Sequence, residues 1–269
     1  GFSGFSPVAV DAAKNVAYGF RDVDGYQALY RVALDGSGNS EQVLARDDVD
    51  IDQLIRIGRQ RRVVGASYAT EKRTIEYLDP ELASLASKLQ AALPGKPLID
   101  IVDASADERT LLIVASSDVD PGMTYLLERD SNRLSPLLPL RDPLVDRPMA
   151  QMKPITFPAA DGTQIPGYLT IPAGASGPMA AIVLPHGGPG SRDEWGFDWL
   201  VQFLAARGYA VLQPNFRGSA GYGDAWFGRN GFQEWETAIG DVNDAGRWLV
   251  AEGIADPARL GIAGWSYGG

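Results

Sequence analysis

Residues 264–268 have the sequence Gly264-Trp265-Ser266-Tyr267-Gly268, and they directly follow the apolar segment 260–263. A Gly-x-Ser-x-Gly run after such a segment is typical of a nucleophile elbow, a sharp strand-to-helix turn that exposes a serine hydroxyl. The serine of this turn is strained, so the residues two places before and after it must be small. A plain glycine-rich loop is the alternative for these five residues alone. Their position after a strand favours the elbow, with Ser266 as the candidate nucleophile.

A second glycine-rich run, His186-Gly187-Gly188-Pro189-Gly190, follows the apolar segment 180–184. A reacting serine needs an oxyanion hole, and one donor of that hole is a backbone N–H in the loop after an earlier strand. We expect the N–H groups of Gly188 and Tyr267 to be the two donors. His186 then orients the loop, with donation from its ring as the alternative. Without catalysis, the run is a mobile connector that contains a hydrogen-bonded histidine.

Strand-like and helix-like segments alternate from residue 148 to residue 269, which predicts a mostly parallel sheet covered by helices on both faces. Together with the elbow after the last strand, this makes an α/β-hydrolase the expected fold. The expected strands are residues 155–158, 167–171, 180–184, 210–213 and 260–263. The expected helices are residues 195–207 and 234–252. Gly208 and Gly253 follow these helices, where a C-terminal cap needs a positive φ. Residues 256–259 before the last strand are interpreted as a turn.

The loop 215–223 follows the strand 210–213, at the sheet edge where ligands of open α/β sheets bind. Arg217 in this loop can contact a substrate carbonyl or carboxylate. The favoured alternative is an ion pair with Asp241 or Asp244 that fixes the loop.

Residues 1–147 contain short apolar runs separated by turns, which predicts a strand-rich domain. Three stretches resemble one another, namely residues 8–32, 53–78 and 100–128. Their spacing of ~40 to 50 residues is the size of a four-stranded propeller blade. The leucine spacing in residues 81–93 predicts a helix inserted between blades. We therefore expect about three blades from the C-terminal part of a β-propeller, with an antiparallel sandwich as the alternative.

The composition excludes several classes of function. The formal charge is -10, from 24 Lys and Arg against 34 Asp and Glu, so nucleic acid is not an expected partner. Cysteine is absent and there is one histidine, so we expect no disulfide, no metal site and no cofactor. The apolar runs are too short to span a bilayer and nothing resembles a signal peptide. We expect a soluble chain without a membrane partner, in the cytoplasm or the periplasm.

Four motifs now support a resemblance: HGGPG, PNFRGSAGYGDAW, DVNDAGRWLV and DPARLGIAGWSYGG, in this order. Over residues 150–269 they resemble the catalytic domain of the prolyl oligopeptidase family, near its acylaminoacyl-peptidase and dipeptidyl-peptidase branches. The resemblance implies a peptidase that acts on short peptides, with the propeller restricting access and Ser266 as the acylated nucleophile. The chain then divides into the propeller part, residues 1–147, and the N-terminal part of the hydrolase domain, residues 148–269.

The sequence departs from that family in its catalytic residues. The family's triad Asp and His follow the nucleophile, whereas this sequence ends at Gly269. We expect both chain ends to be cuts, the rest of the same protein to be the partner, and residues 1–269 alone to be inactive; homo-oligomerisation stays open. Some family members carry an oxyanion-donating tyrosine where His186 stands. A carboxylesterase of the same fold and a catalytically inactive binding protein remain the alternatives.

Overall fold

The computed structural model describes residues 4–188, 190–228 and 233–269, and their contacts divide the chain into two compact units. The first unit is formed by Gly1–Ser116, Gly122–Asp142 and Gly221–Asp224. The second is formed by Ser117–Pro121, Pro143–Ala220 and Ala225–Gly269. Each unit buries apolar clusters of its own, so each has its own core.

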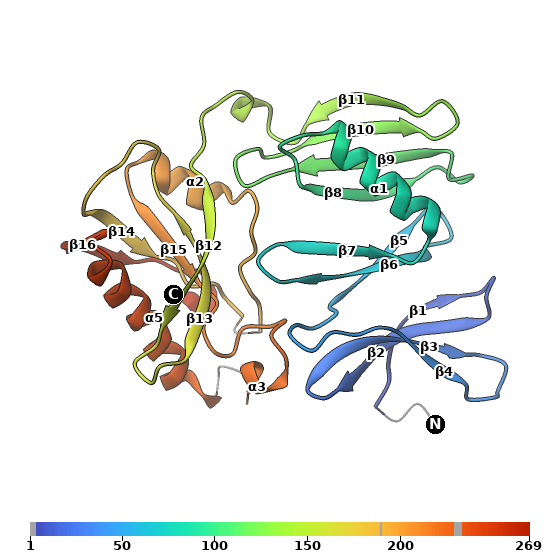
Figure 1. The fold of residues 1–269 in the computed structure, drawn as a ribbon, viewed down its shortest axis with the longest axis horizontal. Helices are drawn as coiled ribbons and strands as arrows, with labels where there is room; N and C mark the ends of the chain where they lie inside the picture. The colour runs from blue at the N-terminus through green and yellow to red at the C-terminus, as the bar shows by residue number, and fades with distance from the viewer. Residues whose placement is uncertain (1–3, 189, 229–232) are drawn as a thin grey trace. The chain divides into compact units, whose positions relative to one another are not determined.

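The first unit contains three antiparallel sheets whose strands follow one another in sequence order (Figure 1). The first sheet comprises β1 (Ser6–Asp11), β2 (Val16–Val23), β3 (Tyr26–Ala33) and β4 (Ser40–Leu44). The second comprises β5 (Gln53–Ile57), β6 (Arg62–Ala69) and β7 (Arg73–Tyr77). The third comprises β8 (Leu98–Ala104), β9 (Thr110–Ser116), β10 (Met123–Glu128) and β11 (Arg133–Pro139). Each is a meander of the kind that forms a propeller blade, as the three repeats predict.

The fourth strands of two blades, β4 and β11, are absent from the sequence-based prediction. Both are edge strands, and most of their residues are exposed or half-buried, so neither shows the apolar alternation that marks a strand. β11 also contains Pro136, which weakens a strand signal. The turn between β2 and β3 is short. β2 continues to Val23, and Asp24 and Gly25 alone turn the chain with φ values of 53° and 87°.

A helix, α1 (Pro80–Ala92), stands between the second and third blades, as the leucine spacing predicts. Asp79 caps its start, because the Asp79 carboxylate accepts hydrogen bonds from the N–H groups of Glu81 and Leu82. Leu82 and Leu89 are buried in a cluster with residues of β8 and β9. The helix therefore belongs to the core of the first unit.

The second unit is built on a five-stranded sheet in the order β12-β13-β15-β14-β16 (Figure 1). The strands are β12 (Met152–Pro158), β13 (Gln164–Thr170), β14 (Met179–Val183), β15 (Ala210–Pro214) and β16 (Ala255–Ile262). β14 pairs in parallel with both β15 and β16, whereas β12 and β13 pair antiparallel. A tight turn joins β12 to β13 and makes that pair a hairpin. Parallel pairing is thus confined to the side of the sheet that carries the elbow.

Helices cover both faces of this sheet. α2 (Trp199–Ala206) and α5 (Trp235–Ala251) are the two main helices, and α3 (Asp224–Phe227) is a short third one that the sequence did not predict. Adjacent residues of a strand point to opposite faces. Val211 of β15 packs with Val201 of α2, whereas Leu212 packs with Leu249 of α5. This arrangement confirms the α/β-hydrolase fold predicted from the sequence.

The start of one helix differs from the prediction by four residues. α2 begins at Trp199 and not at Trp195, because the Asp198 carboxylate accepts from the N–H groups of Leu200 and Val201 and caps the helix there. Gly208 and Gly253 do take positive φ, 91° and 69°.

The predicted turn at residues 256–259 lies inside β16. The pairing with β14 jumps from Met179–Ala255 to Ala181–Leu260, so these residues form an irregularity within the strand. The Asp256 carboxylate accepts from the Ala258 N–H at 2.9 Å, which is the turn chemistry that the sequence signalled.

Candidate active site

Ser266 lies on a sharp turn directly after β16, in a conformation that few non-glycine residues adopt. Its φ is 57°, and the residue is exposed. The N–H groups of Gly268 and Gly269 donate to the carbonyls of Trp265 and Ser266, each at 3.0 Å, and close the turn. This is the strained strand-to-helix turn that presents a serine hydroxyl to a substrate.

The glycines of the elbow are required by close backbone contacts. A Cβ atom on Gly264 would overlap the carbonyl of Gly268, and a Cβ on Gly268 would overlap the carbonyl of Pro185. Neither obstacle is the end of a flexible side chain, so neither can move aside cheaply. The structure therefore gives a steric reason for both glycines of the Gly-x-Ser-x-Gly pattern.

The glycine loop after β14 approaches the elbow through Gly187. A Cβ on this residue would lie 2.8 Å from the Trp265 carbonyl oxygen and 3.3 Å from the Ser266 Cβ. Gly188, the donor chosen from the sequence, has a φ of 128° and turns the loop; its Cβ would crowd the backbone nitrogens of Gly190 and Ser191. The sequence analysis did not predict the contact of Gly187 with the elbow, although the pair of adjacent glycines indicated a close backbone approach. Pro189 lies outside the described residues.

His186 engages both ring nitrogens, one within its own loop and one with the loop after β15. Nδ1 lies 2.7 Å from the Gly187 carbonyl oxygen, and Nε2 lies 2.8 Å from the Ser219 hydroxyl. The ring stacks on Phe216 with centroids 4.5 Å apart. Among the described residues, no hydrogen bond joins His186 to Ser266. The sequence-based interpretation of His186 as a loop-orienting histidine agrees with these contacts.

The hydrogen-bond partners also define the tautomer of His186. The Gly187 carbonyl only accepts, so Nδ1 carries the proton. The Ser219 hydroxyl, which lies 2.8 Å from Nε2, donates to the Phe216 carbonyl at 2.7 Å. Burial lowers the pKa of His186 below its usual value. The ring is therefore neutral, with both nitrogens engaged.

Arg217 forms the ion pair that was favoured over substrate contact. Its Nη2 and Nε donate to the two carboxylate oxygens of Asp241 at 2.6 and 3.0 Å, and its Nη1 donates to Asp161 at 2.5 Å. The Arg217 N–H also donates to Asp241, at 2.9 Å. The other candidate partner, Asp244, instead accepts from the Ala160 N–H. Arg217 thus joins the loop after β15 to α5 and to the β12–β13 turn.

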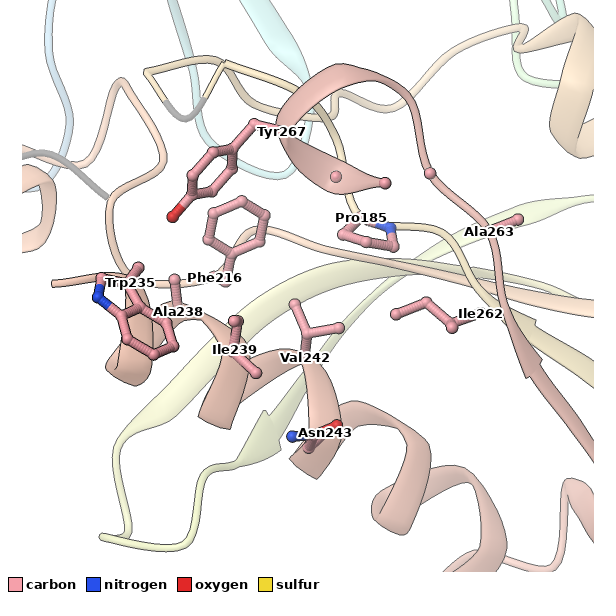
Figure 2. Close-up of a pocket in the computed structure, with 13 residues that line it drawn as sticks. Pro185, Phe216, Trp235, Ala238, Ile239, Val242, Asn243, Ile262, Ala263 and Tyr267 are labelled. Atoms are coloured by element: carbon pink, nitrogen blue, oxygen red, sulfur yellow. The ribbon is translucent and has the colours of Figure 1, made fainter. Parts of the chain in front are cut away.

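An apolar cavity of about 620 Å³ lies beside the elbow (Figure 2). Its lining includes the rings of Phe216 and Tyr267, whose centroids are 6.3 Å apart, together with Ile239 and Val242 of α5. Ser266 is not among the lining residues. The cavity therefore lies next to the candidate nucleophile without opening onto it, and we assign no substrate to it. Among the described residues, no cluster of three acidic or histidine side chains is placed to hold a metal.

The parallel strands β15, β14 and β16, the helices on both faces and the serine turn after β16 define the second unit as an α/β-hydrolase domain. Residues 195–269 match the model of the prolyl oligopeptidase family. The match confirms the family resemblance that the motifs of residues 150–269 indicate. No helix in the described part of the chain has the length and apolar character needed to cross a membrane.

Two curated relatives match nearly the whole chain. Dipeptidyl aminopeptidase BIII of Pseudoxanthomonas mexicana is 30% identical over 260 residues, which are 93% of this chain and 37% of that protein. Dipeptidyl peptidase family member 6 of Caenorhabditis elegans is 32% identical over 276 residues, covering 90% of this chain and 37% of that protein. The chain thus spans little more than a third of the length of these relatives.

A solved structure shares the fold at lower identity. The puromycin-hydrolyzing peptidase of Mycobacterium tuberculosis has a TM-score of 0.72 and 20% identity, and the match covers 98% of this chain and 41% of that one. Acylaminoacyl peptidase of Pyrococcus horikoshii has a TM-score of 0.64 and 19% identity, over 98% and 41% of the two chains.

Proposed function

We propose that the full-length protein is a serine peptidase that cleaves short peptides through an acyl-enzyme at Ser266. The observation that carries the proposal is the exposed Ser266 at a φ of 57°, directly after the parallel strand β16. The names of the relatives, a dipeptidyl aminopeptidase and a dipeptidyl peptidase, support a peptidase. The bond that we propose for cleavage is an aminoacyl or acylaminoacyl bond. The match of residues 195–269 to the prolyl oligopeptidase family supports the same class of reaction.

In the proposed reaction, the Ser266 oxygen attacks the carbonyl carbon of the scissile peptide bond and gives up its proton to a general base. The carbon–nitrogen bond then breaks, and the amine leaves with that proton. Water hydrolyses the remaining ester and restores the hydroxyl. The N–H groups of Gly188 and Tyr267 are the proposed donors to the oxyanion.

The general base of this reaction is a residue other than His186. Both nitrogens of His186 are engaged, by Gly187 and Ser219, and it is the one histidine of the sequence. We propose that the base and its acidic partner belong to the full-length protein outside residues 1–269. We also propose that the boundary between the propeller part and the hydrolase domain lies between residues 147 and 148. The blades would restrict the access of long peptides to the hydrolase domain.

The test is covalent labelling of the full-length protein with a fluorophosphonate, followed by intact-mass analysis. We expect one adduct, on Ser266, and its loss in Ser266→Ala. Ser131→Ala, at an exposed serine of the first unit, is the matched control and should label like the parent. Equal labelling of Ser266→Ala would refute the assignment. A protein that labels and hydrolyses a chromogenic ester but no aminoacyl anilide would be the carboxylesterase, and one that never labels would be the inactive binding protein.

A further inference from the structure

Asp193 attaches the segment after the glycine loop to the end of β15. The Asp193 N–H donates to the Asn215 side-chain oxygen at 2.7 Å, and the Asn215 side-chain nitrogen donates back to the Asp193 carbonyl at 3.0 Å. The Gln213 side-chain nitrogen donates to the Asp193 Oδ1 at 2.9 Å. Three hydrogen bonds, to Gln213 of β15 and to Asn215 directly after that strand, therefore hold this position, three residues after Gly190.

Two atoms of this arrangement lack partners. The Asp193 Oδ2 and the Gln213 Oε1 are sealed from solvent and have no hydrogen-bond partner among the described residues. Asp193 is half-buried as a residue, so its solvent exposure lies elsewhere than at Oδ2, and Gln213 is 3% exposed. Each buried polar atom without a partner costs ~1 to 3 kcal/mol. An ionised carboxylate cannot relieve this cost, since it and the amide oxygen both only accept.

One proton on the Asp193 Oδ2 would supply the hydrogen-bond donor that both buried oxygens lack. On Oδ2 it converts the carboxylate into a donor, and the group that needs a donor is the amide of the same residue that already binds Oδ1. A carboxylic acid and a primary amide match each other in this way, with an O–H donating in one direction and an N–H in the other.

We propose that Asp193 is held as the neutral acid, that its Oδ2–H donates to the Gln213 Oε1, and that this closed pair positions the oxyanion loop. The role of the loop rests on the proposed function above, whereas the protonation of Asp193 does not. Asp193 is a positioning residue: it acts through the segment that begins at Gly190, after the glycine loop, and not on the substrate.

The surroundings of Asp193 support the neutral form. Burial raises the pKa of Asp193 to about 7, and the nearby Asp198 carboxylate at the start of α2 acts in the same direction. The hydrogen bond from Gln213 and the charge of Arg192, on the same segment, act in the opposite direction. From β13, Tyr168 stands opposite Gln213, and burial raises its pKa, so it stays uncharged. The pair is therefore closed below about pH 7 and opens above it.

Asp193→Asn separates protonation from structure. The asparagine amide has the shape of the acid, accepts from the Gln213 nitrogen and donates to the Gln213 oxygen at every pH. We expect the rates of Ser266 phosphonylation of the parent and of Asp193→Asn to agree at about pH 5.5, and the parent to fall about two- to tenfold behind by about pH 8.5, which is the worth of one hydrogen bond. The general base titrates equally in both proteins, so its effect cancels in the ratio. When Gln213→Met is introduced into both proteins, the ratio of their phosphonylation rates should no longer depend on pH, because the amide partner of Asp193 is absent.

A second measurement reads the proton directly and needs no activity. Infrared spectra of full-length protein with ¹³C-labelled aspartate should show a protonated carboxylic acid band at about pH 5.5 that is missing from Asp193→Asn and that fades towards about pH 8.5. Absence of this band in the parent overturns the neutral acid. A band together with a rate ratio that stays constant with pH overturns the positioning role. A protein that shows the band but never labels Ser266 refutes the proposed function and leaves the acid–amide pair standing.

Discussion

Arg217 and Asp241 form a two-point ion pair in which the carboxylate is wholly buried. The Nη2–Oδ1 and Nε–Oδ2 distances are 2.6 and 3.0 Å, and Asp241 is 0% exposed. The pair raises the pKa of Arg217 above its ordinary value, because ionised Asp241 stabilises the cation. Arg217 follows Phe216, on which His186 stacks, so the ion pair supports the packing beneath the glycine loop.

Loss of this ion pair should destabilise the second unit. Asp241→Ala leaves Arg217 without its main partner and removes the acceptor of the Arg217 N–H, and we expect a loss of about 3 kcal/mol in the free energy of unfolding. The matched control is Arg259→Ala, which breaks a more exposed pair with Asp256 in the same unit and should cost under about 0.5 kcal/mol. Denaturant titration measures both. Equal effects would show that Arg217 and Asp241 are no more than a surface pair.

Two glycines, one within β16 and one just after it, should differ strongly in how much stability an added methyl group costs. Gly264→Ala places a Cβ against the Gly268 carbonyl, and we expect a loss above about 3 kcal/mol together with loss of Ser266 labelling. Gly261→Ala, within β16, meets no atom within 4 Å and should change stability by under about 0.5 kcal/mol. Thermal unfolding and fluorophosphonate labelling check both. Normal labelling of Gly264→Ala would contradict the close crossing of the elbow.

The glycine loop should depend more on its backbone than on its histidine. Gly188→Val should lower peptidase turnover of the full-length protein by about 10²-fold or more, as loss of one oxyanion donor does. Its strain at a φ of 128° makes a thermal unfolding curve a necessary companion measurement. His186→Ala removes a ring that orients the loop and should reduce turnover less. A larger loss in His186→Ala, at equal stability, would make the His186 ring the donor.

Stability should depend on pH through Asp193. Its pKa is raised to about 7 in the folded protein, against about 3.9 in an unfolded chain. Because the folded pKa is the higher one, folding takes up a proton between these values and the parent loses stability as the pH rises through this window. Asp193→Asn avoids that loss, so its stability advantage should grow from about pH 4 to about pH 7 and then level off, with a ceiling of about 4 kcal/mol. Denaturant titrations across this range measure it, and an advantage independent of pH would contradict the raised pKa.

Local sequence signals predicted the elements that a single segment determines. The apolar run in β14 and the glycines around Ser266 act within a few residues, and the sequence shows them directly. The start of α2 was missed because Asp198 caps it inside a run that is apolar on both sides. The contact between Gly187 and the elbow joins residues far apart in the chain.

Tertiary pairing explains what the sequence could not reveal in the candidate site. Asp193 and Gln213 belong to no motif, and nothing in the sequence marks a buried acid opposite an amide; only the fold brings them within 2.9 Å. Arg217 was paired correctly because an arginine in a loop beside a helix with two acids has few alternatives.

At Ser266 the φ of 57° costs stability, whereas the proposed reaction requires the serine hydroxyl at that position. Backbone in this region costs a non-glycine residue ~1 to 3 kcal/mol, and glycine would adopt it almost freely. A chain selected for stability alone would therefore replace this serine by glycine and lose the hydroxyl. Ser266→Gly should therefore have a higher melting temperature than the parent although it lacks the hydroxyl. A screen that ranks variants by melting temperature alone would favour loss of the proposed nucleophile.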